Sequence, residues 1–132
     1  MVIYIPTMST KYIAPGEIAS SSDFLHGCFV SCLIDSSKNA VMGHWGAGLS
    51  GTHLDWLKEV ASENLTDIVK GAILFLREED QMELVCSYGD YLGWLDGFKS
   101  SIQEEFGCNV KTVPYYIGAI INLELERNLS VD

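Results

Sequence analysis

Two residues that each follow a glycine are the best candidates for chemistry in this chain, a cysteine and a histidine. Gly27-Cys28 opens one strand-like run, and Gly43-His44 closes the next. If the two runs pair as a hairpin, the thiol and the imidazole lie at the same end of it. A thiol beside an imidazole provides a nucleophile and a base, the two groups needed for nucleophilic attack on an amide carbonyl. The pair therefore predicts an enzyme.

The flanking segments are typical of a β-hairpin that would position this pair. Phe29–Asp35 is rich in apolar and β-branched residues, Ser36–Asn39 supplies turn chemistry, and Ala40–Trp45 is the returning strand. Side chains alternate between the faces of a strand, so Cys28 and Cys32 share one face. Cys32 has apolar neighbours there and is predicted to be a core thiol. Cys28 stands at the edge of the strand and is left as the reactive thiol.

Three neighbours of the pair are predicted to help bind the substrate. Gly27 lets the backbone turn sharply before the thiol. The backbone N–H groups from Gly27 to Phe29 could face a developing oxyanion. Trp45, together with the glycine-rich loop after it, would shape the entrance, although a packed core indole explains Trp45 equally well.

Each member of the pair could also have a purely structural role. A lone cysteine in a strand is usually inert packing, and a lone histidine is usually a satisfied structural residue. The placement of both at matched ends of a hairpin favours catalysis. His26 is a rival base two residues from the thiol, and His53 is expected to be exposed at a helix start.

The order of elements predicts an α/β fold of the α+β type. Beyond the hairpin, the chain reads as a helix, two strands, a helix and two strands. This order favours a single-domain layered sandwich over residues 1–132, with mixed, mostly antiparallel β-sheets and two main helices. The elements expected outside the hairpin are a strand at Val2–Ile5, a helix from Ser50 or Thr52 to about Asn64, strands at Gly71–Leu76 and Met82–Ser87 joined by Glu78–Asp80, a helix at Asp90–Phe106, and strands at Cys108–Val113 and Tyr115–Glu126.

Composition and charge argue against several classes of partner. The net charge is −10, from 18 acidic and 8 basic residues, whereas binding to nucleic acid or an anionic membrane needs Lys and Arg. A basic protein surface is a better partner. No apolar run is long enough to span a membrane and the N-terminus has no signal peptide, so a cytoplasmic protein is expected. The four cysteines lack the spacing of a zinc site, so we expect neither a metal nor another cofactor.

A longer motif surrounds the pair. It reads Gly-Cys-x-Val-x-Cys-Leu-x-Asp from Gly27, then a short turn, then Val-Met-Gly-His ending at His44. This motif resembles the core of CheD-type chemoreceptor glutamine deamidases. Related chemistry on a similar fold occurs in the deamidase domains of cytotoxic-necrotizing-factor toxins. The resemblance covers Pro15 to Gly46.

The resemblance implies that Cys28 is the nucleophile and His44 its base. It also implies a third polar site residue shortly before the cysteine. Counting back from Cys28 selects Ser22, whereas counting forward from the preceding Pro-Gly turn selects Ser20; we prefer Ser22. The implied reaction is hydrolysis of a glutamine side-chain amide on a protein substrate, which yields glutamate and ammonia through a thioester.

Several functions stay open beside a chemotaxis deamidase. A Trp-Gly step follows His44 where the CheD family has Leu-Pro, so a bacterial effector or toxin secreted into a host cell is an alternative setting. The same pair could serve another cysteine hydrolase or a transglutaminase. The acidic charge would also suit a non-catalytic binding or inhibitor module that covers a basic surface.

Overall fold

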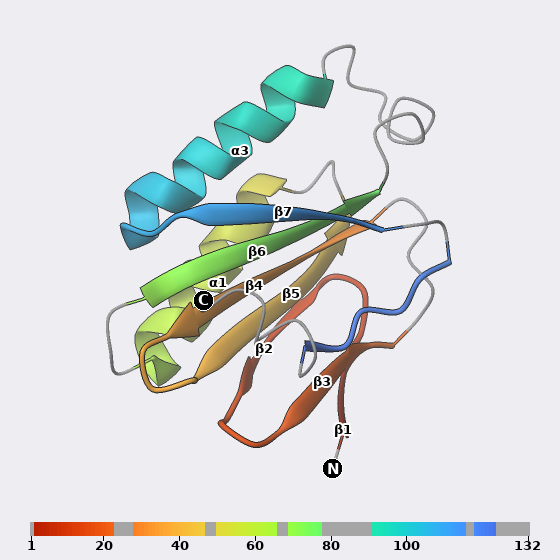
Figure 1. Cartoon of the computed structure of the whole chain (residues 1–132), viewed down its shortest axis with the longest axis vertical. Helices are drawn as coiled ribbons and strands as arrows, with labels where there is room; N and C mark the ends of the chain where they lie inside the picture. Colours follow the sequence, from red (N-terminus) through yellow and green to blue (C-terminus); the bar gives the residue numbers. More distant parts are fainter. Residues whose placement is uncertain are drawn as a thin grey trace.

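The computed structural model describes residues 2–22, 28–46, 50–65, 69–77, 91–115 and 118–123 (Figure 1). Within these ranges the chain forms seven strands and two helices, which confirms the predicted α/β class with mixed, mostly antiparallel pairing. In chain order the elements are β1 (Val2–Ile5), β2 (Ser9–Ile13), β3 (Ile18–Ser21), β4 (Cys28–Asp35), β5 (Ala40–Gly46), α1 (Ser50–Asn64), β6 (Val69–Arg77), α3 (Tyr91–Phe106) and β7 (Val110–Tyr115).

A five-stranded sheet forms the centre of the fold, in the order β2-β5-β4-β6-β7. Its strands pair antiparallel except for the parallel pair of β6 and β7. The helices α1 and α3 lie over one face of this sheet (Figure 1). The parallel pair of β1 and β3 forms a smaller sheet over the other face. The described elements therefore form three layers, with a packed core on each side of the central sheet.

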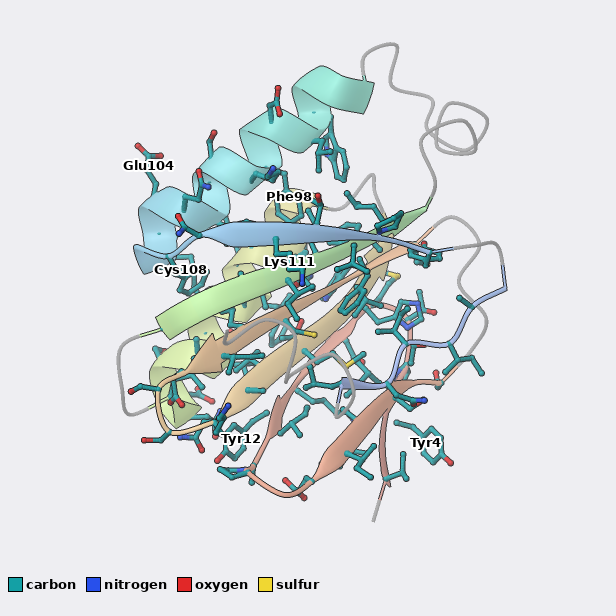
Figure 2. The ribbon with its side chains drawn as sticks, viewed as in Figure 1. Tyr4, Tyr12, Phe98, Glu104, Cys108 and Lys111 are labelled. Carbon is teal, nitrogen blue, oxygen red and sulfur yellow. The ribbon has the colours of Figure 1, made fainter. Side chains whose placement is uncertain are left out.

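Strand alternation explains how β4 and β5 contribute to both cores. On the helix side, Phe29 of β4 and Trp45 of β5 pack with residues of α1 and α3. On the other side, Cys32 packs with residues of the small sheet. It is fully buried there, as its position in the strand predicted. In α3, Phe98 points towards the central sheet and Glu104 points away from it (Figure 2).

The strands β4 and β5 form the predicted hairpin, and the side chain of Asp35 holds its loop. The carboxylate accepts hydrogen bonds from the backbone N–H groups of Ser37 at 3.0 Å and Asn39 at 2.9 Å, and from Asn39 Nδ2 at 3.0 Å. Lys38 has a φ of 69°, a left-handed conformation found in tight turns. The loop matters for the site because a shift of one residue would turn every side chain of one strand to the other face.

The two edges of the central sheet differ from the sequence prediction. The edge strand β2 was not predicted, because its sequence Ser-Thr-Lys-Tyr-Ile is more polar than a typical strand. The predicted strand Tyr115–Glu126 is wrong in its described part, since β7 ends at Tyr115. Gly118 has a φ of 85°, which a continuous strand does not accommodate. Beyond it, Asn122 makes only an isolated bridge to Ser20 of β3.

Two further predictions, the strand Met82–Ser87 and the hairpin tip Glu78–Asp80, lie outside the described residues. The strand β6 pairs with β4 on one side and with β7 on the other. In the part of the chain that the structure describes, no helix is long and apolar enough to cross a membrane.

Candidate functional site

The register of the hairpin places Cys28 and His44 on one face of the central sheet. Cys28 lies opposite Gly46, and His44 lies opposite Val30. The two residues are therefore diagonal neighbours, two positions apart, on the face that the small sheet covers. Diagonal neighbours are roughly 7–8 Å apart, which long and aromatic side chains can span. The structure brings the predicted nucleophile and base to the same end of the sheet, but not directly opposite each other.

His44 is held from the small sheet. Its side chain is 1% exposed, and its Nδ1 lies 3.1 Å from the backbone oxygen of Ile5, the last residue of β1. A carbonyl oxygen can only accept a hydrogen bond, so Nδ1 carries the proton. In the neutral ring the lone pair is then on Nε2, the atom that a general base would use. This hydrogen bond therefore fixes both the orientation and the tautomer of the imidazole.

The same carbonyl connects His44 to Ser22, the preferred third residue. The Ile5 oxygen also accepts hydrogen bonds from the Ser22 backbone N–H at 3.2 Å and from Ser22 Oγ at 3.4 Å. Ser20, the alternative, is buried, and its hydroxyl donates to the backbone oxygen of Ser21 at 3.3 Å. Ser22 therefore belongs to the group around the imidazole, whereas the hydroxyl of Ser20 is engaged locally within β3.

Two opposing effects act on the half-buried thiol of Cys28. Burial raises the pKa of Cys28, and a hydrogen bond with the side chain of Thr7 lowers it by a smaller amount, so the net pKa is raised. A raised pKa means that the thiol is protonated at neutral pH, and a base must take its proton before it can attack. The backbone carbonyl of Cys28 accepts a hydrogen bond from the hydroxyl of Tyr115, at the end of β7.

Sequence reasoning missed both Thr7 and Tyr115. Thr7 lies in the short turn between β1 and β2, and no spacing rule connects that turn with Cys28. Tyr115 reaches Cys28 only because β7 joins the sheet beyond β6. Both contacts depend on tertiary arrangement, and nothing in the local sequence marks either residue.

Two predicted substrate-binding residues have side chains on the opposite face. Phe29 is fully buried in the core beneath the helices. The indole of Trp45 is 3% exposed in the same core, and its Nε1 donates to Thr10 Oγ1 at 2.8 Å. Trp45 therefore has the packed position that the sequence left open as an alternative, and it does not border Cys28. Gly27 and His26 lie outside the described residues, and the N–H groups of Gly27 and Phe29 stay predicted oxyanion donors.

His53 is the residue whose environment differs most from expectation. It was expected to be exposed, but this residue of α1 is fully buried against the helix side of the sheet. Its Nε2 lies 2.5 Å from Ser31 Oγ, and its ring is surrounded by Phe29, Trp45 and Phe98. Burial lowers the pKa of His53 to about 3, so the ring is neutral at ordinary pH. Because it lies across the sheet from Cys28, it cannot act as the base for that thiol.

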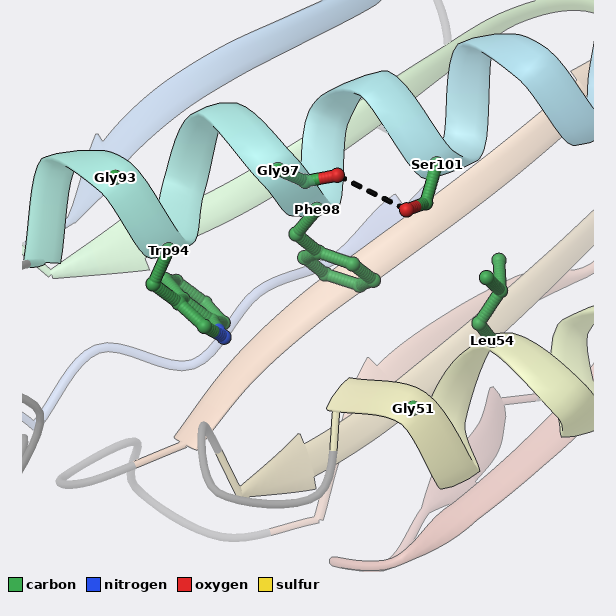
Figure 3. A pocket seen from close by; sticks show the side chains of 7 residues that line it. All are labelled: Gly51, Leu54, Gly93, Trp94, Gly97, Phe98 and Ser101. Atoms are coloured by element: carbon green, nitrogen blue, oxygen red, sulfur yellow. Dashed lines mark hydrogen bonds between the residues drawn. The ribbon is translucent and has the colours of Figure 1, made fainter.

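A separate cavity of about 380 Å³ lies between α1 and α3 (Figure 3). Trp94 and Phe98 project into it from α3, and the hydroxyl of Ser101 donates to the backbone oxygen of Gly97 at 2.9 Å. Its lining residues are Gly51, Leu54, Gly93, Trp94, Gly97, Phe98 and Ser101. This cavity belongs to the helix layer and does not reach the face that carries Cys28. Over the described ranges, no group of three or more His, Cys, Asp or Glu side chains could hold a metal ion.

The geometry defines a mixed α/β protein with a half-buried thiol at one end of its central sheet. A protein of similar fold is NMB0706 of Neisseria meningitidis, whose crystal structure is described under the family model DUF152. The TM-score is 0.53 and the sequence identity 13%, and the match covers 96% of this chain and 66% of that chain. No family model matches the sequence, and no curated protein matches it. At this identity, the similarity shows the fold alone.

The resemblance to CheD-type and cytotoxic-necrotizing-factor deamidases is wrong. The solved structure of NMB0706, which matches 96% of this chain, is instead described under DUF152. The misleading motif is short, and much of it is what any buried strand would contain. Val30 and Cys32 are core residues on one face of β4, and Leu33 is a core residue on the other. Asp35 is explained by its role in the hairpin loop.

Proposed function

We propose that this chain is a cysteine-dependent amide hydrolase, with Cys28 as nucleophile and His44 as general base. The observation that carries the proposal is the placement of the two residues on one face, with His44 Nδ1 fixed by the Ile5 carbonyl. A nucleophile, a base and a group that orients the base form the arrangement that activated nucleophiles need. Ser22 shares the orienting carbonyl and completes the proposed site.

The proposed reaction begins with a neutral thiol, because the pKa of Cys28 is raised by burial. As the sulfur attacks the amide carbon, His44 Nε2 takes the thiol proton and a C–S bond forms. The imidazolium then gives this proton to the leaving nitrogen, the C–N bond breaks and ammonia departs. Water attacks the resulting thioester, with His44 taking a proton from it; the C–S bond then breaks, and His44 returns the proton to the departing sulfur. The products are a carboxylic acid and the free thiol.

The half-buried position of Cys28 favours a side-chain amide as substrate. A glutamine carboxamide sits at the end of a flexible chain and can reach a recessed sulfur while the substrate backbone stays outside. A peptide bond would have to bring two flanking residues into the same space. We therefore propose deamidation of glutamine on a protein substrate, with a basic surface favoured as partner because the chain carries a net charge of −10.

Replacing Cys28 with alanine is expected to lower ammonia release by at least about 10³-fold, because the nucleophile is lost. The assay follows ammonia and the one-dalton mass gain of glutamine, with carbobenzoxy-Gln-Gly and unfolded casein as substrates. Cys32→Ala is the matched control, since Cys32 lies on the same face of β4 but is fully buried. The Cys32→Ala protein is expected to release ammonia at the rate of the parent protein. Equal rates for Cys28→Ala and the parent protein would refute the proposal.

The same assay separates two alternatives. Cross-linked product in the presence of cadaverine would identify a transglutaminase that uses the same pair. A non-catalytic acidic binding module is favoured by one observation, the raised pKa of Cys28, which is the opposite of an activated thiol. For that module we expect no ammonia release from the parent protein, and salt-sensitive binding to a basic protein such as lysozyme.

A further inference from the structure

The end of β4 that carries Cys28 extends beyond the ladder between β4 and β6. On one side of β4, the pairing with β5 begins at Cys28 itself. On the other side, the ladder with β6 runs only from Val30 to Asp35, although β6 continues to Arg77. Among the strands that the structure describes, the backbone at Cys28 therefore has a paired neighbour on one side only.

The hydroxyl of Tyr115 takes the place of a strand neighbour on the other side, where it donates a hydrogen bond to the Cys28 carbonyl. Tyr115 is the last residue of β7, and β6 lies between β7 and β4, so its side chain reaches across β6 to make this contact. Tyr115 is buried in the same core cluster as Ile5, whose carbonyl orients the His44 ring. This core therefore contributes one hydrogen bond to the nucleophile and another to the base.

We propose that Tyr115 is a positioning residue for Cys28, which fixes the backbone at the start of β4 so that the thiol stays within reach of His44. The inference rests on the proposed function, and it adds to that site a residue from outside the hairpin. Cys28 and His44 are diagonal neighbours, and such residues are roughly 7–8 Å apart, so the thiol must be well directed to meet the imidazole. The peptide group is planar, so a bond to the Cys28 carbonyl limits the backbone rotation that would redirect the sulfur.

The test begins with Tyr115→Phe, which removes the hydroxyl and keeps the ring that packs in the core. The rate of Cys28 alkylation by iodoacetamide is measured from about pH 6 to about pH 10, with Cys28→Ala protein as the blank for the other thiols. A nearby imidazole promotes formation of the reactive thiolate, so we expect Tyr115→Phe to slow alkylation near neutral pH about 3- to 10-fold. In a His44→Gln background the same substitution should change the rate little, because no imidazole is left for the thiol to meet.

The matched control is Tyr12→Phe, which also removes a tyrosine hydroxyl from this sheet. Tyr12 donates to Asn39 Oδ1 at 2.7 Å, at the loop end of the hairpin and away from Cys28. It is expected to retain the alkylation profile of the parent protein. With carbobenzoxy-Gln-Gly as substrate, Tyr115→Phe is expected to lower kcat about 10-fold with little change in KM, because the hydroxyl directs the sulfur and does not bind substrate.

Three results would each overturn the inference. The first is a Tyr115→Phe protein with the alkylation profile of the parent. The second is an effect of equal size in the presence and absence of His44, which is what a purely structural role gives. The third is a Tyr12→Phe protein that is alkylated as slowly as Tyr115→Phe. Failure of the proposed function looks different, since Cys28→Ala and the parent protein would then give equal ammonia release.

Discussion

Gly43→Ala is expected to destabilise the protein by about 2–4 kcal/mol, because there is no room for a methyl group at this position. A Cβ atom built on Gly43 would lie 2.4 Å from His53 Cε1, 2.9 Å from His53 Nδ1 and 3.1 Å from Thr10 Oγ1. The imidazole cannot withdraw easily, since it is fully buried and its Nε2 contacts Ser31 Oγ at 2.5 Å. Either the ring moves and this contact is lost, or α1 is displaced from the sheet.

Urea unfolding of the parent and variant proteins measures the effect, and Gly46→Ala is the matched control. Gly46 lies in the same strand, but a Cβ there would meet nothing within 4 Å. The free energy of unfolding of the Gly46→Ala protein is expected to differ from that of the parent protein by less than about 1 kcal/mol. In the background of His53→Ala, where the ring is absent, Gly43→Ala should cost much less than in the parent protein. A Gly43→Ala protein with the unfolding midpoint of the parent would show that the strand and helix are not packed this closely.

The role of Gly43 illustrates what the sequence could and could not predict. The hairpin was predictable because its signals are local, namely alternating apolar residues and a polar turn. The sequence placed Cys28 and His44 only at the same end of this hairpin, and the register of the two strands puts them on one face. The glycine before the histidine was interpreted as a feature of the thiol–imidazole site. Its physical role is on the opposite face, where its missing side chain makes room for His53.

The errors at the site share a cause, since each depends on how layers pack. The sequence shows that Trp45 and His53 are near the pair, but not that the helix layer buries both on the far side of the sheet. It also does not show that the turn containing Thr7 reaches Cys28. The family resemblance failed for a related reason, because a short motif of buried-strand residues reports packing as much as chemistry.

Acid is expected to destabilise this protein strongly through His53, well before most carboxylates are protonated. Burial lowers the pKa of His53 from 6.5 to about 3. Between these two values the unfolded chain binds a proton that the folded protein does not, so the free energy of unfolding falls as the pH falls. The loss approaches about 1.4 kcal/mol for each pH unit inside this window and amounts to about 2 kcal/mol between pH 6.5 and pH 4.5. The full stability from this group is present only above pH 6.5.

The contribution of His53 can be separated from that of other titrating groups by a variant that cannot be protonated. His53→Gln keeps a polar group within reach of Ser31, but it has no proton to gain in this range. It will be less stable than the parent protein at pH 7.5, because the ring also packs against Phe29 and Phe98. The informative quantity is therefore the difference in free energy of unfolding between the two proteins at each pH. That difference should shrink by about 2 kcal/mol between pH 6.5 and pH 4.5. A constant difference would mean that the imidazole reaches solvent or can be protonated in the folded state, and that α1 is not packed against the sheet as described.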